Sequence, residues 1–124
     1  MSKENGLVFS IEREEPYYIE ITDYNQIVEH LGCTYFTVAY RTIGNKHYTI
    51  YCDDIGLLKE HPVITYFGND NDILVGNLIV TGYPMPDGTT APLTVEDVDN
   101  IMAYVVPCWN TKDGNIYPVI MNTK

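Results

Sequence analysis

The stretch YYIEITDYNQIVEHLG, residues 17–32, carries the clearest structural signals in the chain. Residues 17–21 alternate between two sets of side chains, which predicts a strand with every second residue facing a core. Thr22 or Asp23 can then cap a helix. Its apolar positions have the i, i+3, i+4, i+7 spacing of an amphipathic face and are Tyr24, Ile27, Val28 and Leu31. Gly32 follows, where a left-handed residue would end the helix.

A hairpin is predicted immediately after this helix. Residues 33–43 are rich in Thr, Tyr, Phe and Val, as strands are, and residues 46–52 form the returning strand. Gly44 and Asn45 between them predict a two-residue turn, because both residues tolerate a positive φ. The core face is expected to carry Phe36, Val38, Tyr40, Tyr48 and Ile50. The opposite face would then carry Tyr35, Arg41, His47 and Tyr51.

The flanking segments add further strands and a second helix. Residues 7–11 alternate and predict a short strand, whereas residues 73–82 are apolar on both faces, which is typical of a central strand. Residues 83–92 hold three prolines and predict a loop. Thr94 can cap a second helix with Asp97 completing the capping box. The apolar face of that helix is formed by Val95, Val98, Ile101, Met102 and Val105.

These elements predict an α+β fold in one acidic domain that spans residues 1–124. A chain of 124 residues suits a single domain with its own core. We expect a mixed or antiparallel sheet of about five strands, packed with two helices in a single pair of layers. The tail, residues 107–124, contains Asp113 followed by Gly114 and is expected to form a terminal hairpin.

The charge balance narrows the choice of partners. Seven Lys and Arg oppose 17 Asp and Glu, for a net charge of −10. A chain this acidic repels phosphate backbones and anionic lipids, so neither nucleic acid nor a membrane is an expected partner. Tyrosine is unusually common, with 11 copies. That number of phenol rings predicts that some lie at the surface or in an interface, because each buried hydroxyl needs a hydrogen-bond partner.

No constellation for catalysis, metal binding or cofactor binding is predicted. His30, His47 and His61 are scattered without metal-ligand spacing, and the three cysteines form no Cys-x-x-Cys pair. Serine occurs only at Ser2 and Ser10. The N-terminus lacks the apolar stretch of a signal peptide, so a cytoplasmic location is expected.

Two surface features are the candidate partner-binding sites. The first is a row of tyrosines on the face of the sheet away from the core, formed by Tyr18, Tyr35 and Tyr51. In the alternative interpretation the second helix covers this face and these rings belong to the core. The second feature is an acidic belt formed by Asp53, Asp54, Glu60, Asp70 and Asp72, with more carboxylates at residues 12–15. The alternative here is a solvated loop surface of no special role.

The chain resembles the family called domain of unknown function 3846 over about residues 17–105. The features that carry the resemblance are IEI at residues 19–21, the helix at 24–31 with Gly32, the strand at 35–38, IYCDDIGLL at 50–58, Pro62, ILVGNLIVTG at 73–82 and LTVED at 93–97. The resemblance implies small proteins of phages, plasmids and mostly Gram-positive bacterial genomes, and it implies no activity. The tail after Pro107 is expected to be an addition to the family pattern.

The leading functional hypothesis is a non-enzymatic binding protein of phage or mobile-element origin. Its acidic, tyrosine-rich surface would contact a host protein with a basic surface, as an inhibitor of a defence system or as a DNA mimic. One alternative is a sponge for a nucleotide signal, in which rings stack on the base and the ligand contacts are Arg41, Lys46 and His47. A second alternative is an accessory domain with no antagonist role. A homodimer is a further expectation left open.

Overall fold

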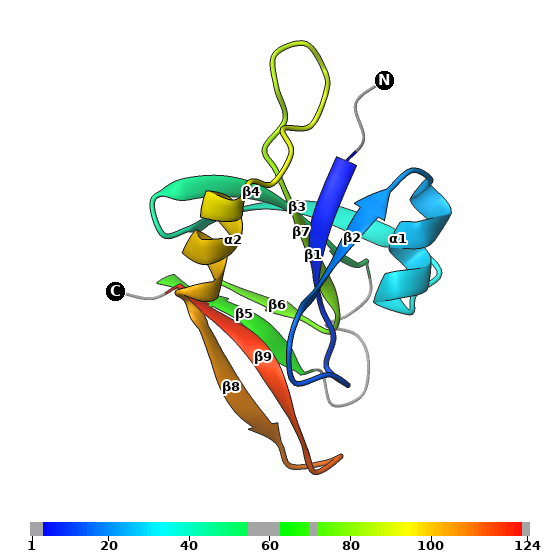
Figure 1. The fold of residues 1–124 in the computed structure, drawn as a ribbon. Coiled ribbons are helices and arrows are strands. Elements are labelled where there is room, and N and C mark those ends of the chain that lie inside the picture. The colour runs from blue at the N-terminus through cyan, green and yellow to red at the C-terminus, as the bar shows by residue number, and fades with distance from the viewer. Residues whose placement is uncertain (1–3, 55–62, 70–71, 123–124) are drawn as a thin grey trace.

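The structure is a computed structural model that describes residues 4–54, 63–69 and 72–122. In these residues it contains two helices and nine strands, which confirms the α+β class (Figure 1). The elements in chain order are β1 (Glu4–Phe9), β2 (Tyr17–Ile21), α1 (Tyr24–Leu31), β3 (Phe36–Ile43), β4 (Lys46–Asp53), β5 (Ile64–Gly68), β6 (Ile73–Val75), β7 (Leu78–Thr81), α2 (Val95–Met102), β8 (Val105–Asn110) and β9 (Asn115–Asn122).

The described strands form two sheets. The larger sheet has the order β2-β1-β7-β4-β3, and all its neighbours are antiparallel. The smaller sheet has the order β6-β5-β9-β8, with β5 parallel to β9. The second sheet was not expected from the sequence, because β5 carries too short an apolar run to stand out and β9 was assigned only to a terminal hairpin.

The strand and helix predicted within residues 17–32 are confirmed. Asp23 caps α1, where its carboxylate accepts a hydrogen bond from the Asn25 amide at 2.8 Å. The side chain of Gln26 completes a capping box. Gly32 ends the helix with φ at 68°, in the left-handed region that glycine occupies without a steric penalty. α1 buries Ile27 against one face of the larger sheet.

The turn at Gly44 and Asn45 is also confirmed, but the predicted face assignment of this hairpin is wrong. Ile43 pairs with Lys46 across the turn, and Val38 therefore lies opposite Tyr51. With a two-residue turn, even-numbered residues of β3 share a face with odd-numbered residues of β4. Each of the two predicted faces therefore mixes side chains from opposite sides of the sheet.

The predicted long strand at residues 73–82 is divided between the two sheets. Gly76 has φ at 76° and redirects the chain, so that β6 ends in the smaller sheet and β7 begins in the larger one. β7 is the central strand of the larger sheet, and all four of its residues are buried. The Asn77 side chain stabilises this change of direction between β6 and β7. Its Oδ1 accepts a hydrogen bond from the Ile11 amide at 2.9 Å, and its Nδ2 donates one to the Leu31 carbonyl at 3.2 Å.

The C-terminal part confirms the second helix and the terminal hairpin, with one change at their junction. Val105 was expected on the helix, but α2 ends at Met102 and Val105 begins β8. The hairpin is integrated into the core because β9 lies between β5 and β8. Ile120 of β9 is fully buried between the sheets.

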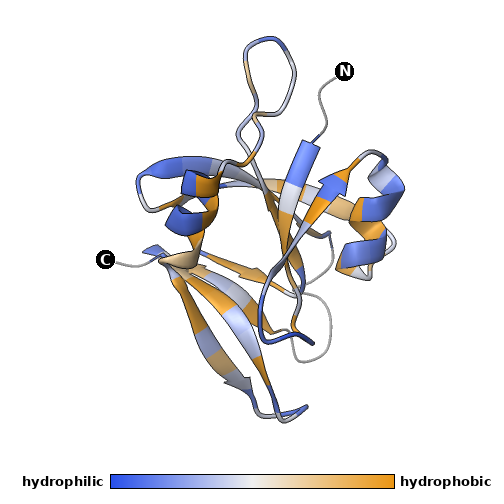
Figure 2. Cartoon of the chain, viewed as in Figure 1, coloured by the Kyte–Doolittle hydropathy of each residue, from blue (hydrophilic) through white to orange (hydrophobic). Residues whose placement is uncertain are grey.

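The larger sheet has a hydrophobic cluster on each face. One cluster fills the space between the two sheets and α2, and includes Phe9, Ile50 and Val80. The other lies under α1 and includes Val8 and Ile79. In Figure 2 the hydrophobic colour is concentrated on strands such as β6 and β7, whereas the tip of the β3–β4 hairpin and much of the projecting loop between β7 and α2 are hydrophilic. Within the described ranges no helix has the length and apolar character needed to cross a membrane.

Candidate functional site

The open end of the β3–β4 hairpin places a tyrosine and two aspartates next to one another along the paired backbones. Phe36 begins β3 opposite Asp53, the last residue of β4. One residue further out, the Asp54 amide donates to the Tyr35 carbonyl at 3.2 Å. Tyr35 is 74% exposed, Asp54 is exposed and Asp53 is half-buried. Three of the predicted candidates, Tyr35, Asp53 and Asp54, therefore lie at one place on the surface.

Helix α1 adds a further ring to this end of the hairpin. Tyr24 lies in the first turn of α1, exposed, with its ring stacked on that of Phe36 at a centroid distance of 6.2 Å. The helix thereby adds an exposed aromatic ring beside the first residue of β3. We call the set of Tyr24, Tyr35, Phe36, Asp53 and Asp54 the acidic corner.

Tyr51 is buried beneath Phe36 and is not part of the exposed acidic corner. This corrects the prediction that Tyr51 belongs to an exposed row of tyrosines. Its ring meets Phe36 edge to face at 5.3 Å, and only 7% of the residue is exposed. The hydroxyl donates to Glu4 Oε1 at 2.6 Å. Burial first, and then the Glu4 carboxylate, raise the pKa of Tyr51 well above its usual value.

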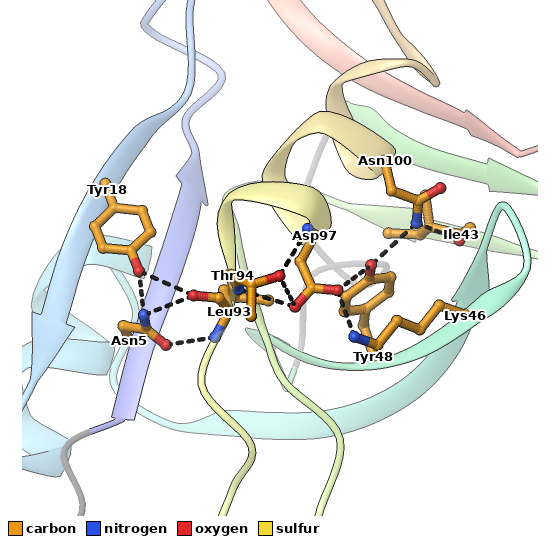
Figure 3. Close-up of polar contacts among 9 residues, drawn as sticks. All are labelled: Asn5, Tyr18, Ile43, Lys46, Tyr48, Leu93, Thr94, Asp97 and Asn100. Carbon is orange, nitrogen blue, oxygen red and sulfur yellow. Dashed lines mark hydrogen bonds and ion pairs between the residues drawn. The ribbon is translucent and has the colours of Figure 1, made fainter.

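Tyr18 lies far from the acidic corner, so the predicted row of three tyrosines does not exist. β2 and β3 are at opposite edges of the larger sheet. Tyr18 is also on the other face, because it is paired with Leu7, whose side chain lies between the sheets. Figure 3 shows its hydroxyl beside the Asn5 amide and the Leu93 carbonyl. The alternation of side chains along β2 is visible in the sequence. The order of the strands in the sheet, which separates Tyr18 from Tyr35, is not.

The acidic belt is present only in part. Asp72 lies near β3 and is paired with Arg41, whose Nε is 2.9 Å from Asp72 Oδ2. Asp70 and Glu60, also assigned to the belt, lie outside the described residues. Asp53 and Asp54 are the members of the belt that the structure places together.

The three residues predicted to bind a nucleotide do not converge. Arg41 and Lys46 share one face of the β3–β4 hairpin, and each already contacts a carboxylate. His47 points to the opposite face, where Nδ1 is 2.8 Å from Thr42 Oγ1 and the ring lies 5.7 Å from that of Tyr83. The reason is again the register of the hairpin, which separates neighbours along β4 onto different faces.

A buried polar network joins α2 to the β3–β4 hairpin (Figure 3). The Asp97 carboxylate is 3% exposed and receives hydrogen bonds from Lys46 Nζ at 2.5 Å, the Tyr48 hydroxyl at 3.0 Å and the Thr94 amide at 2.9 Å. Burial alone would raise the pKa of Asp97, but these donors outweigh it and hold the pKa below its usual value. The capping box was predicted; its partners on β4 were missed because they lie about fifty positions away.

The described residues contain no group of three His, Cys, Asp or Glu side chains placed to hold a metal ion. Cys33, Cys52 and Cys108 form no disulfide bond. Burial raises the pKa of the Cys52 thiol, an effect that Asp53 and Asp54 reinforce and Arg41 opposes. A raised pKa leaves little thiolate at neutral pH, so Cys52 is a poor nucleophile.

Taken with its fold, this geometry defines a small α+β domain of two packed sheets with an aromatic and acidic corner on its surface. The chain belongs to the family described as domain of unknown function (DUF3846), whose model matches residues 5–105. The match begins within β1, earlier than the sequence resemblance indicated, and ends at the first residue of β8. Comparison with curated proteins and with solved structures found no match.

Proposed function

We propose that this protein is a non-catalytic binding protein whose acidic corner contacts a basic surface of another protein. The observation that carries the proposal is that the exposed Tyr35 is hydrogen-bonded through its backbone to Asp54 and adjoins the Phe36–Asp53 pair at one end of the hairpin. The net charge of −10 would steer such a molecule toward a positively charged partner.

The chemistry of the acidic corner fits arginine and lysine side chains. A guanidinium group stacks on aromatic rings and forms paired hydrogen bonds with a carboxylate, and both kinds of group are present within this small area. Tyr24 and Tyr35 provide large contact areas at a low cost in side-chain entropy, which is why tyrosine is common in binding hot spots.

In this proposal the partner is a protein of a bacterial host, and the chain comes from a phage or mobile element and acts in the host cytoplasm. Covering a basic surface that normally contacts nucleic acid would inhibit the partner, as a DNA mimic does. The same chemistry also serves an accessory protein without an inhibitory role, and the identity of the partner distinguishes the two.

The test uses charge reversal with a matched control. The double variant Asp53→Lys with Asp54→Lys removes the carboxylates of the acidic corner, whereas Glu14→Lys with Glu15→Lys makes the same change of charge on the exposed loop between β1 and β2. Each variant is used beside the wild type to capture proteins from a bacterial lysate, and the recovered partner is then titrated at several salt concentrations.

We expect the Asp53/Asp54 variant to lose at least about tenfold in affinity and the Glu14/Glu15 variant to stay within about threefold. Binding by the wild type should weaken as salt is raised. Equal losses in both variants would mean that net charge acts without a site, and retained, salt-independent binding by the Asp53/Asp54 variant would refute the proposal.

A further inference from the structure

The edge strands of the two sheets are protected to different degrees. An unpaired strand edge invites pairing with another chain, and proteins block it with short strands, proline or charge. Among the described edge strands, β6 has three residues, β8 contains Pro107, and β2 carries Glu20, whose carbonyl accepts a hydrogen bond from Gln26 Nε2 at 3.4 Å. β3 has eight residues and no proline, and its one charged residue, Arg41, is paired with Asp72.

The outer edge of β3 is accessible over its first half. Because Ile43 and Lys46 close a two-residue turn, the even-numbered residues of β3 direct their amide and carbonyl groups away from β4. The Thr42 carbonyl accepts hydrogen bonds from Asn122 and Tyr66, so the smaller sheet covers the turn end. The Tyr40 carbonyl accepts a hydrogen bond from Arg41 Nη1 at 3.0 Å, and this bond does not use its second lone pair. The described part of the chain provides no cover at Val38.

The side chains beside this edge are apolar and exposed. Val38 is 41% exposed and Tyr40 is 54% exposed, on the same face of the sheet. The Tyr40 ring contacts that of Tyr83 at 5.8 Å, which widens the patch into the loop after β7. An aliphatic and an aromatic side chain two positions apart on an edge strand are suited to cross-strand contacts with a second strand.

Charge indicates which strand can approach. Residues 33–52 contain no Asp or Glu, although the chain has 17. The charged residues within 33–52 are Arg41, which is paired with Asp72, and Lys46, which is paired with Asp97. Two copies with a net charge of −10 repel one another, and residues 33–52 add no negative charge to that repulsion.

We infer that β3 is a dimerisation strand, which pairs antiparallel with β3 of a second copy to join two larger sheets into one. An antiparallel pair of identical strands has twofold symmetry, so one strand supplies both halves of the interface. With the axis near Ala39, Val38 of one copy lies opposite Tyr40 of the other, and Arg41 lies opposite Thr37, so that no like charges face each other. The acidic corners remain at the two ends of the joined strands.

The experiment measures the mass of the full chain by size-exclusion chromatography with light scattering over a wide concentration range. Val38→Pro removes an amide that points away from β4, so it should weaken the dimer and leave the β3–β4 ladder intact. Because the dimer is twofold symmetric, the substitution removes one amide donor from each copy, two in all. Val95→Pro is the matched control, because Val95 is the exposed first residue of α2, where proline is tolerated.

We expect the wild type and Val95→Pro to have the mass of two chains, and Val38→Pro to raise the dissociation constant by about tenfold or more. Tyr40→Lys, which leaves the backbone unchanged, should also dissociate the dimer by placing two ammonium groups near the axis. A wild type that stays monomeric at every concentration, or a dimer that survives both folded variants, would overturn the inference.

Discussion

The ammonium nitrogen of Lys46 lies 2.5 Å from Oδ1 of Asp97, and this pair fastens the tip of the β3–β4 hairpin to the first turn of α2 (Figure 3). The same carboxylate accepts from the Tyr48 hydroxyl, and its second oxygen accepts from the Thr94 amide. One buried carboxylate thus serves as helix cap and as the anchor of a distant strand.

Replacement of Asp97 by alanine is expected to cost about 2 kcal/mol of unfolding free energy, because it removes a helix cap and leaves the Tyr48 hydroxyl without this acceptor. Chemical denaturation at neutral pH measures the loss. Glu96→Ala in the same turn is exposed and should cost much less. Equal effects of the two substitutions would contradict the anchoring role of Asp97.

The stability of the protein should fall in acid through Asp97. Its folded pKa is lower than the unfolded value of about 3.9, so its stabilising contribution is complete above that pH and is lost as the pH falls through the folded pKa. Urea unfolding at a series of pH values should show a smaller acid loss for Asp97→Asn than for the wild type. Parallel curves for the two proteins would count against this assignment.

Buried tyrosines should ionise late in an alkaline titration. Burial raises the pKa of Tyr48 to about 12, with Asn100 opposing the rise and Asp97 adding to it. Because the folded pKa lies above the unfolded value of about 10, the stability that Tyr48 contributes is lost as the pH rises from there through about 12. Ultraviolet difference absorbance follows phenolate formation, and Tyr48→Phe should remove one late-titrating group without altering the early phase.

Gly82 should tolerate no side chain, since a Cβ there would lie 1.7 Å from the carbonyl oxygen of Ala91. We expect Gly82→Ala to cost about 3 kcal/mol, because two backbone segments must separate. Gly76→Ala is the comparison: its φ is 76° but no atom lies within 4 Å of the added carbon, so backbone strain of about 1 kcal/mol is its main cost. Thermal melts rank the two, and an equal or larger loss at Gly76 would disprove the close approach at Gly82.

Two isoleucines of β9 test whether the tail outside the family match belongs to the core. Ile120 is fully buried between the sheets, whereas Ile116, near the start of the same strand, is 37% exposed. Ile120→Ala should cost about 3 kcal/mol and Ile116→Ala well under half of that, because the cost follows the buried volume that is lost. If both variants unfold like the wild type in denaturant, the hairpin is not part of the cooperative core.

The sequence by itself determined the elements whose hydrogen bonds close within a few residues. The cap at Asp23, the left-handed Gly32, the two-residue turn after Ile43 and the capping box at Thr94 all formed where their residue types predicted. Each depends on contacts between residues no more than four positions apart, so local chemistry is sufficient to specify it.

Tertiary structure alone decided which of these elements meet and which side chains they cover. Nothing local indicates that the chain changes sheets at Gly76, that Tyr51 lies under Phe36 while Tyr35 stays exposed, or that Arg41 pairs with Asp72. Burial of a strand face depends on elements that lie far away in the sequence. Three residues of the acidic corner, Tyr35, Asp53 and Asp54, could therefore be predicted from the sequence. The addition of Tyr24 and Phe36, and the separation of Tyr18, depended on how the sheets and α1 pack.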